Sequence, residues 1–134
     1  MTVLVIDGMG GGIGKSMIER LKAEAPELTV GAVGTNSIAT SVMLRAGADF
    51  GATGENAVIY NAARADYIVG VLGIVVANSM HGEISPRMAE AISASPAHKI
   101  LIPTDKCNVT VTGVGAISVQ TCIHEVIDKL QKRG

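Results

Sequence analysis

Short apolar runs alternate with longer amphipathic stretches along most of the chain. The run at residues 3–6 ("VLVI") has no polar alternation, which is typical of a strand buried on both faces of a parallel sheet. The stretch at residues 13–25 repeats its apolar side chains at helical spacing, which predicts a helix with one buried face. Six strands are predicted on this basis, at residues 3–6, 28–33, 48–50, 67–71, 99–102 and 109–112.

Local signals mark the ends of several predicted helices. Pro26 closes the first helix, Asn36 or Ser37 caps the second, and Gly47 ends it. Ser85 followed by a proline is typical of a helix start. The stretch "LGIVVANSMHGE" at residues 72–83 fits no element clearly. The predicted helices cover residues 13–25, 37–46, 55–65, 86–94 and 117–130.

This alternation of strands and helices predicts the fold class. We expect an α/β fold of one domain over residues 1–134: a Rossmann-like open three-layer sandwich with a mostly parallel sheet of five to six strands. Hydrophobic residues make up 48% of the chain and charged residues 17%, so a packed core is expected. With one Phe, two Tyr and no Trp, that core must be aliphatic.

Charge and hydropathy indicate which classes of partner and which cellular location to expect. The net charge is −1 and no basic run precedes the C-terminal "KLQKRG", which argues against nucleic-acid binding. The longest apolar run, residues 67–77, is too short to cross a bilayer. Two cysteines and the lack of a signal-like N-terminus predict a cytoplasmic protein without a membrane partner. A mean hydropathy of +0.39 favours a homo-oligomer, most simply a dimer, with residues 67–77 as an interface if they are exposed.

The densest local signal is a glycine-rich turn between the first strand and the first helix. Glycine lets a ligand approach the backbone closely, and a helix that begins here directs its free N–H groups at an anion. Asp7, at the strand end, caps the turn or faces the ligand. Packing of helix against sheet is the alternative reason for these glycines. The turn holds Gly8, Gly10, Gly11, Gly12 and Gly14.

The spacing of these glycines matches one dinucleotide-binding pattern and fails another. G-x-G-x-x-G fails from either Gly8 or Gly10. G-x-x-x-G-x-G fits Gly8, Gly12 and Gly14, and this resembles the turn of short-chain dehydrogenases and reductases over roughly the first forty residues. That family's Tyr-x-x-x-Lys pair is missing, and no acidic residue follows the second strand to bind a ribose.

A P-loop is the competing interpretation of the same turn. Gly14, Lys15 and Ser16 supply the second half of G-x-x-x-x-G-K-[ST], but Met9 occupies the position of its first glycine. We therefore expect a nucleotide or other phosphate-bearing ligand, most plausibly NADP or NAD. Gly10, Gly11, Gly12, Ile13, Gly14, Lys15 and Ser16 would surround the phosphates, with Thr35 and Asn36 near the sugar.

Other candidate groups follow the later strands. Because ligands bind beyond the carboxyl ends of parallel strands, we expect Asn78 and Ser79 to join the same site. His81 and Glu83 are candidates for proton transfer, and Cys107, beside Lys106, is a candidate reactive thiol. His81-Gly82-Glu83 lacks the downstream P-C-x-x-C of zinc deaminases, so no metal site is expected. A solvated loop without function is the alternative for these residues.

Longer segments carry a second resemblance. "VIDGMGGGIGK", "GTNSIATSVMLRAGAD", "ATGENAV", "VGVLGIVVANSMHGEISPRMAEAI" and "KILIPTDKCNVTVTGV" together resemble a family of short bacterial proteins described only as a domain of unknown function. The resemblance covers residues 3–114. It implies a Rossmann-like nucleotide-binding fold in a stand-alone cytosolic protein, and it implies no reaction.

Three hypotheses for the function remain. The first is a protein that binds a phosphate-bearing ligand at the glycine-rich turn. The second is a non-enzymatic regulatory or scaffold subunit that oligomerises through residues 67–80. The third is a small enzyme that uses His81, Glu83 or Cys107.

Overall fold

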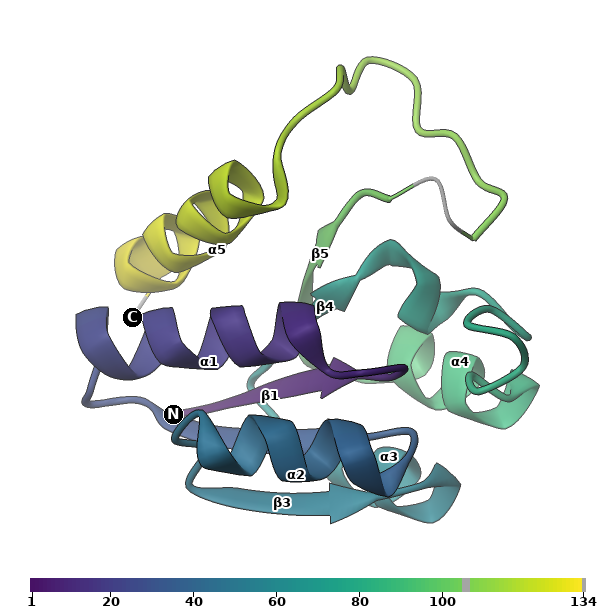
Figure 1. Ribbon diagram of the computed structural model, residues 1–134, viewed down its shortest axis with the longest axis horizontal. Coiled ribbons are helices and arrows are strands. Elements are labelled where there is room, and N and C mark those ends of the chain that lie inside the picture. The colour runs from purple at the N-terminus through teal and green to yellow at the C-terminus, as the bar shows by residue number, and fades with distance from the viewer. Residues whose placement is uncertain (105–106, 134) are drawn as a thin grey trace.

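Five parallel strands form one sheet in the computed structural model, which describes residues 1–104 and 107–133 (Figure 1). The sheet order is β3-β2-β1-β4-β5. The strands are β1 (Thr2–Asp7), β2 (Thr29–Gly34), β3 (Phe50–Thr53), β4 (Tyr67–Val71) and β5 (His98–Ile102). The helices are α1 (Gly12–Glu24), α2 (Ser37–Arg45), α3 (Glu55–Ala62), the 3₁₀ helix η1 (Leu72–Val75), α4 (Pro86–Ala94) and α5 (Val119–Arg133).

The helices cover both faces of the sheet. α1 packs against α2 and α5 on one face, and α3 packs against α4 on the other (Figure 1). This arrangement follows from the strand order, in which the chain runs outward from β1 to β3 on one side and from β4 to β5 on the other. The predicted fold class, an open three-layer α/β sandwich, is therefore confirmed with an all-parallel sheet.

The core is aliphatic and centres on β1 and β4. Val3 and Leu4 of β1 are at most 1% exposed, and every residue of β4 is buried. Within residues 67–77, only Ala77 is exposed. The buried part of this run belongs to the core of one copy, whereas Leu72, Val75 and Val76 are half-buried, so the predicted role of the run in an interface stays a prediction.

The helix caps follow the sequence signals. Asn36 caps α2 by accepting the Ala39 N–H at 2.9 Å, and Ser85 caps α4 by accepting the Met88 N–H at 3.2 Å. Some boundaries differ by one to three residues. The third strand, expected at residues 48–50, lies at Phe50–Thr53 because it pairs in register with the second half of β2.

The predicted sixth strand is wrong. Residues 109–112 are exposed and belong to no strand, and β5 pairs only with β4 among the described residues. The β-branched pattern "VTVT" favours an extended strand, but a strand needs a partner for its hydrogen bonds. Within one copy, this segment is paired with no strand that the structure describes.

Candidate functional site

The glycine-rich turn lies at the topological switch point of the sheet. The chain leaves β1 toward β2 on one side and leaves β4 toward β5 on the other. In doubly wound sheets, ligands bind in the crevice that this divergence opens beyond the carboxyl ends of the strands. Here the turn after β1 and the loop that joins η1 to α4 lie at this end of the sheet.

The five glycines of the turn lie in three different structural environments. A Cβ on Gly8 would lie 2.5 Å from the Thr35 hydroxyl, and a Cβ on Gly14 would lie 2.5 Å from the Met43 sulfur. Gly11 has a φ of +75°, which favours glycine. Gly10 and Gly12 would meet no atom within 4 Å. Packing therefore explains two glycines and backbone conformation explains a third, whereas Gly10 and Gly12 border open space.

Asp7 caps the inner side of the turn. Its carboxylate is buried and accepts the N–H groups of Gly8 and Gly14, each at 2.8 Å. Burial raises the pKa of Asp7 above its ordinary value; the two N–H bonds oppose that rise, and the nearby Glu83 carboxylate adds to it. The two interpretations of Asp7 are thereby decided in favour of capping.

The outer N–H groups of the turn are left free by this arrangement. Gly14 is the third residue of α1 and its N–H is taken by Asp7. The N–H groups of Gly12 and Ile13 have no hydrogen-bond partner within residues 1–104 and 107–133. Helix N-termini bind anions through such groups and through the helix dipole.

Glu83 joins three loops at the carboxyl end of the sheet through hydrogen bonds. Its Oε1 accepts hydrogen bonds from the Thr35 hydroxyl at 2.5 Å, the Met9 N–H at 2.9 Å and the Asn36 side-chain amide at 2.9 Å. The Thr35 bond, the Met9 bond and then the Asn36 bond lower the pKa of Glu83, although partial burial opposes this. Glu83 is therefore a stable carboxylate that positions loops, and it is poorly suited to donating a proton.

The loop after η1 holds strained backbone. Asn78, Met80 and His81 have φ values of 67°, 57° and 56°, a region that side chains other than glycine adopt at a cost. Ser79 is buried and donates its hydroxyl to the Gly73 carbonyl. Asn78 and His81 are exposed. Of the residues predicted here, Ser79 is thus used internally, whereas Asn78 and His81 face solvent.

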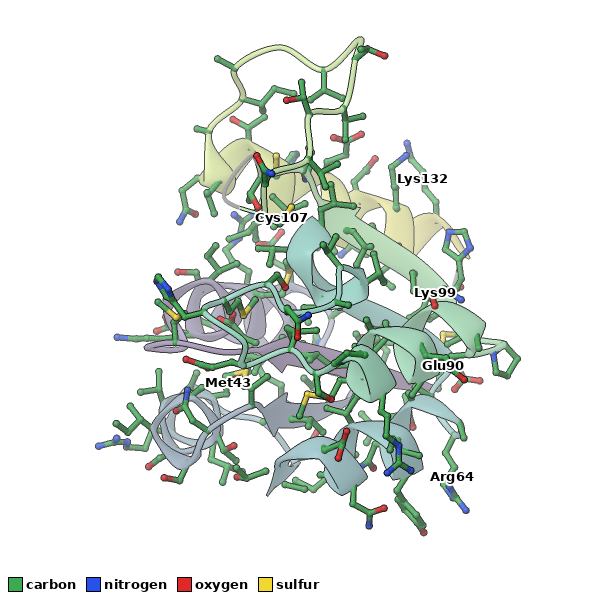
Figure 2. The ribbon with its side chains drawn as sticks, turned by 90° about the vertical axis from the view of Figure 1, so that its right-hand side faces the viewer. Met43, Arg64, Glu90, Lys99, Cys107 and Lys132 are labelled. Carbon is green, nitrogen blue, oxygen red and sulfur yellow. The ribbon has the colours of Figure 1, made fainter. Side chains whose placement is uncertain are left out.

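Cys107 contacts residues outside the glycine-rich turn. Its thiol is 3.5 Å from the Thr104 carbonyl, and it packs beside Gly73 of η1 (Figure 2). Lys106, whose charge the sequence offered as a reason for thiol reactivity, lies outside the described residues. The predicted role of Cys107 therefore stays a prediction.

Lys15 and Ser16 complete the predicted phosphate site. They follow Gly14 in the first turns of α1, where Lys15 is exposed and Ser16 is half-buried. Among the described residues, no three His, Cys, Asp or Glu side chains are grouped to hold a metal ion. The described helices are all too short or too polar to cross a bilayer.

These features define a doubly wound, all-parallel α/β protein with a glycine-rich turn at its switch point. The family model "Domain of unknown function (DUF3842)" matches residues 2–134, so the chain belongs to this family, as the sequence resemblance implied. No curated protein sequence matches the chain.

One solved structure of similar fold is a dodecameric FMN-dependent UbiX-like decarboxylase from Escherichia coli O157:H7. The two share 15% sequence identity with a TM-score of 0.51, over 98% of this chain and 93% of the other. At this identity the likeness establishes the fold.

The expectation of NADP or NAD is wrong in the light of this comparison. The solved structure of similar fold is described as FMN-dependent, and FMN is a flavin and not a nicotinamide nucleotide. The contacts agree with this correction. Thr35 and Asn36, expected near a sugar, already donate to Glu83, so these donors are used within the protein.

Proposed function

We propose that the turn from Gly8 to Ser16 binds the terminal phosphate of a phosphate-bearing ligand, and that this ligand is FMN. The observation that carries the proposal is the pair of free N–H groups at Gly12 and Ile13, which border open space at the N-terminus of α1. The Lys15 ammonium adds a positive charge within the first turns of the helix. A single phosphate suits a site with so few free donors.

The residues around the turn suit the rest of such a ligand. Met9 is 48% exposed and Ile38 is 66% exposed, and they belong to segments joined by the hydrogen bond from Asn36 to the Met9 carbonyl. Two exposed apolar side chains beside a polar turn offer a surface to a flat apolar ring. Bound FMN would supply redox chemistry; Gly12, Ile13 and Lys15 would bind its phosphate, and Glu83 would hold the loops in place.

FMN differs from riboflavin by its phosphate, so the comparison of these two ligands tests the phosphate site. Isothermal titration calorimetry should show FMN binding at least ten-fold more tightly than riboflavin, which has the same ring without the phosphate. Inorganic phosphate should compete with FMN. Equal binding of FMN and riboflavin would contradict the assignment of the turn as a phosphate site.

A substitution at Gly12 tests the location. Gly12→Val places a side chain in the open space without contacting protein atoms, so FMN binding should be lost while the fold is kept. The matched control is Ala23→Val, which adds the same side chain at the exposed far end of α1 and should bind FMN like the wild type. Unchanged binding by Gly12→Val would place the ligand elsewhere.

We further propose that the protein functions as a homo-oligomer, as the dodecameric enzyme of similar fold does. Residues 108–121 are all exposed, yet five of them are large apolar residues: Val109, Val111, Val114, Ile117 and Val119. Exposed apolar groups gathered in one segment are typical of a protein interface.

A further inference from the structure

The segment between β5 and α5 is an extended arm, which we define as residues 107–118. It contains no helix or strand, and in two views it arches away from the sheet (Figures 1 and 2). Loops of this length without secondary structure are uncommon in compact domains and are usually functional. Val111 is 41% exposed and Ile117 is 48% exposed, which is unfavourable for a single copy in water.

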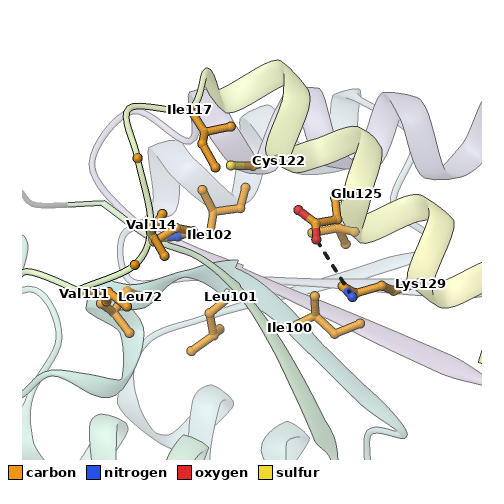
Figure 3. A pocket seen from close by; sticks show the side chains of 14 residues that line it. Leu72, Ile100, Leu101, Ile102, Val111, Val114, Ile117, Cys122, Glu125 and Lys129 are labelled. Carbon is orange, nitrogen blue, oxygen red and sulfur yellow. Dashed lines mark ion pairs between the residues drawn. The ribbon is translucent and has the colours of Figure 1, made fainter.

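A groove runs along β5 below the arm. A cavity of about 500 Å³ lies between β5, α5 and the arm, and a second hollow of about 440 Å³ continues along residues 98–101. The first is mainly apolar, with Ile100 and Ile102 on the strand side and Cys122 on the helix side (Figure 3). Val111 and Val114 of the arm reach its rim without filling it.

The outer edge of β5 is open as well. β5 pairs with β4 on one side and with no described strand on the other. Unpaired strand edges are templates for another extended segment. Doubly wound sheets of order 3-2-1-4-5-6 hold a sixth strand at this position. The segment with the strand-like pattern "VTVT", residues 109–112, lies unpaired in the arm.

We propose that the arm of one copy binds the groove and the open β5 edge of a second copy, and that the exchange is reciprocal. Residues 109–112 would add a strand to the partner copy's β5, while Val111 and Val114 would enter its cavity. This inference rests on the proposed homo-oligomer and assigns its interface. Both complementary parts, an apolar arm and an apolar groove, belong to the same chain, so a second copy satisfies both at once.

The size and the charge of the two surfaces agree with this occupant. Fourteen consecutive residues, 108–121, are exposed in each copy. With the residues that line the groove, each copy would contribute a set of interface residues within the about 20–30 per partner that a stable interface uses. The groove is bordered by Lys129 and Lys132, whereas residues 107–118 carry no charge, so the arm meets no like charge there.

Sedimentation velocity of the full chain tests the proposal. The wild type should be a dimer or a multiple of dimers, and Val111→Asp should shift the association midpoint to at least ten-fold higher concentration. The control Tyr60→Asp removes a side chain that is 54% exposed on α3 and should leave the assembly unchanged. Circular dichroism should show the same folded signal for all three. A wild-type assembly that Val111→Asp leaves intact would overturn the proposal.

Cross-linking decides whether the arm binds its own chain or another. In a Cys107→Ser, Cys122→Ala background, one chain carries Leu101→Cys and a second, differently tagged chain carries Val111→Cys. Oxidation of the mixture should give a hetero-tagged disulfide dimer. A third chain carries both cysteines. If this chain forms the disulfide within itself while the mixture forms none between chains, the arm pairs with its own β5 and the proposal fails. A wild type that sediments as a monomer would also refute the proposed homo-oligomer. Neither the sedimentation result nor the cross-linking result bears on FMN binding at Gly12, which is measured separately.

Discussion

The turn after β1 and the arm after β5 leave the same edge of one parallel sheet but are held very differently. The turn is fixed by the Asp7 carboxylate from inside and by Glu83 from outside, and its free groups are polar N–H donors. The arm is exposed over its length from residue 108, and its free groups are apolar side chains. A rigid polar turn suits a small anion, whereas an extended apolar segment suits a protein surface.

Removing the internal cap should have the largest effect. Asp7→Ala leaves the N–H groups of Gly8 and Gly14 buried without acceptors, at a cost of about 2 to 4 kcal/mol in the free energy of unfolding. Urea denaturation measures it. Asp7→Asn keeps one oxygen acceptor and removes the buried charge, so it should cost clearly less. Equal stability of Asp7→Ala and the wild type would show that the turn is not held from inside.

The glycines of the turn should separate into two groups. Gly14→Ala places a Cβ against the buried Met43 side chain and should cost about 1 to 3 kcal/mol in the free energy of unfolding. Gly12→Ala meets no atom and should stabilise the fold by about 0.4 to 1 kcal/mol, because it restricts the unfolded chain. Thermal or urea unfolding of both variants checks this. Similar costs for the two would remove the distinction between packing glycines and open glycines.

The pH dependence of stability should report on Glu83. Its folded pKa lies below the ordinary value of 4.5, so its charged form stabilises the folded state above that pH. The stabilisation is lost as the pH falls through the lowered pKa. Glu83→Gln keeps an oxygen for the three donors but cannot titrate. The wild type should therefore exceed this variant in stability near pH 7, and the difference should shrink below pH 4.5.

The smallest effect is expected in the arm. Val114→Ser changes a side chain that is 41% exposed, so the unfolding free energy of the monomer should change by less than about 0.5 kcal/mol. Chemical denaturation at a concentration below the association midpoint measures it. A large loss of stability would mean that the arm contributes to the core of its own chain, against the comparison drawn above.

Local patterns were sufficient for most of the fold. The uninterrupted apolar runs of β1 and β4, and the caps at Asn36 and Ser85, depend on neighbours close in sequence. The "VTVT" segment shows where such patterns fail. Its β-propensity is local, but a strand also needs an edge to pair with, and that edge is not encoded in the segment.

The candidate site was harder to predict for the same reason. The glycine-rich turn itself is continuous in sequence, but the contact that holds it from outside joins Glu83 to Met9, 74 residues away. No spacing rule links these two residues. The division of the glycines also depends on distant side chains, because the position of Met43, together with that of Asp7, makes Gly14 a packing glycine.

Amide chemical shifts give the most direct test of the phosphate site. In a ¹H–¹⁵N correlation spectrum of the full chain titrated with FMN, the Gly12 and Ile13 resonances should shift most, because their N–H groups are free to bind the phosphate. The Gly14 resonance should move little, since its N–H already donates to Asp7. Riboflavin should not reproduce the Gly12 and Ile13 shifts. Shifts confined to β5 and α5, with Gly12 and Ile13 unmoved, would contradict the assignment of this turn as the ligand site.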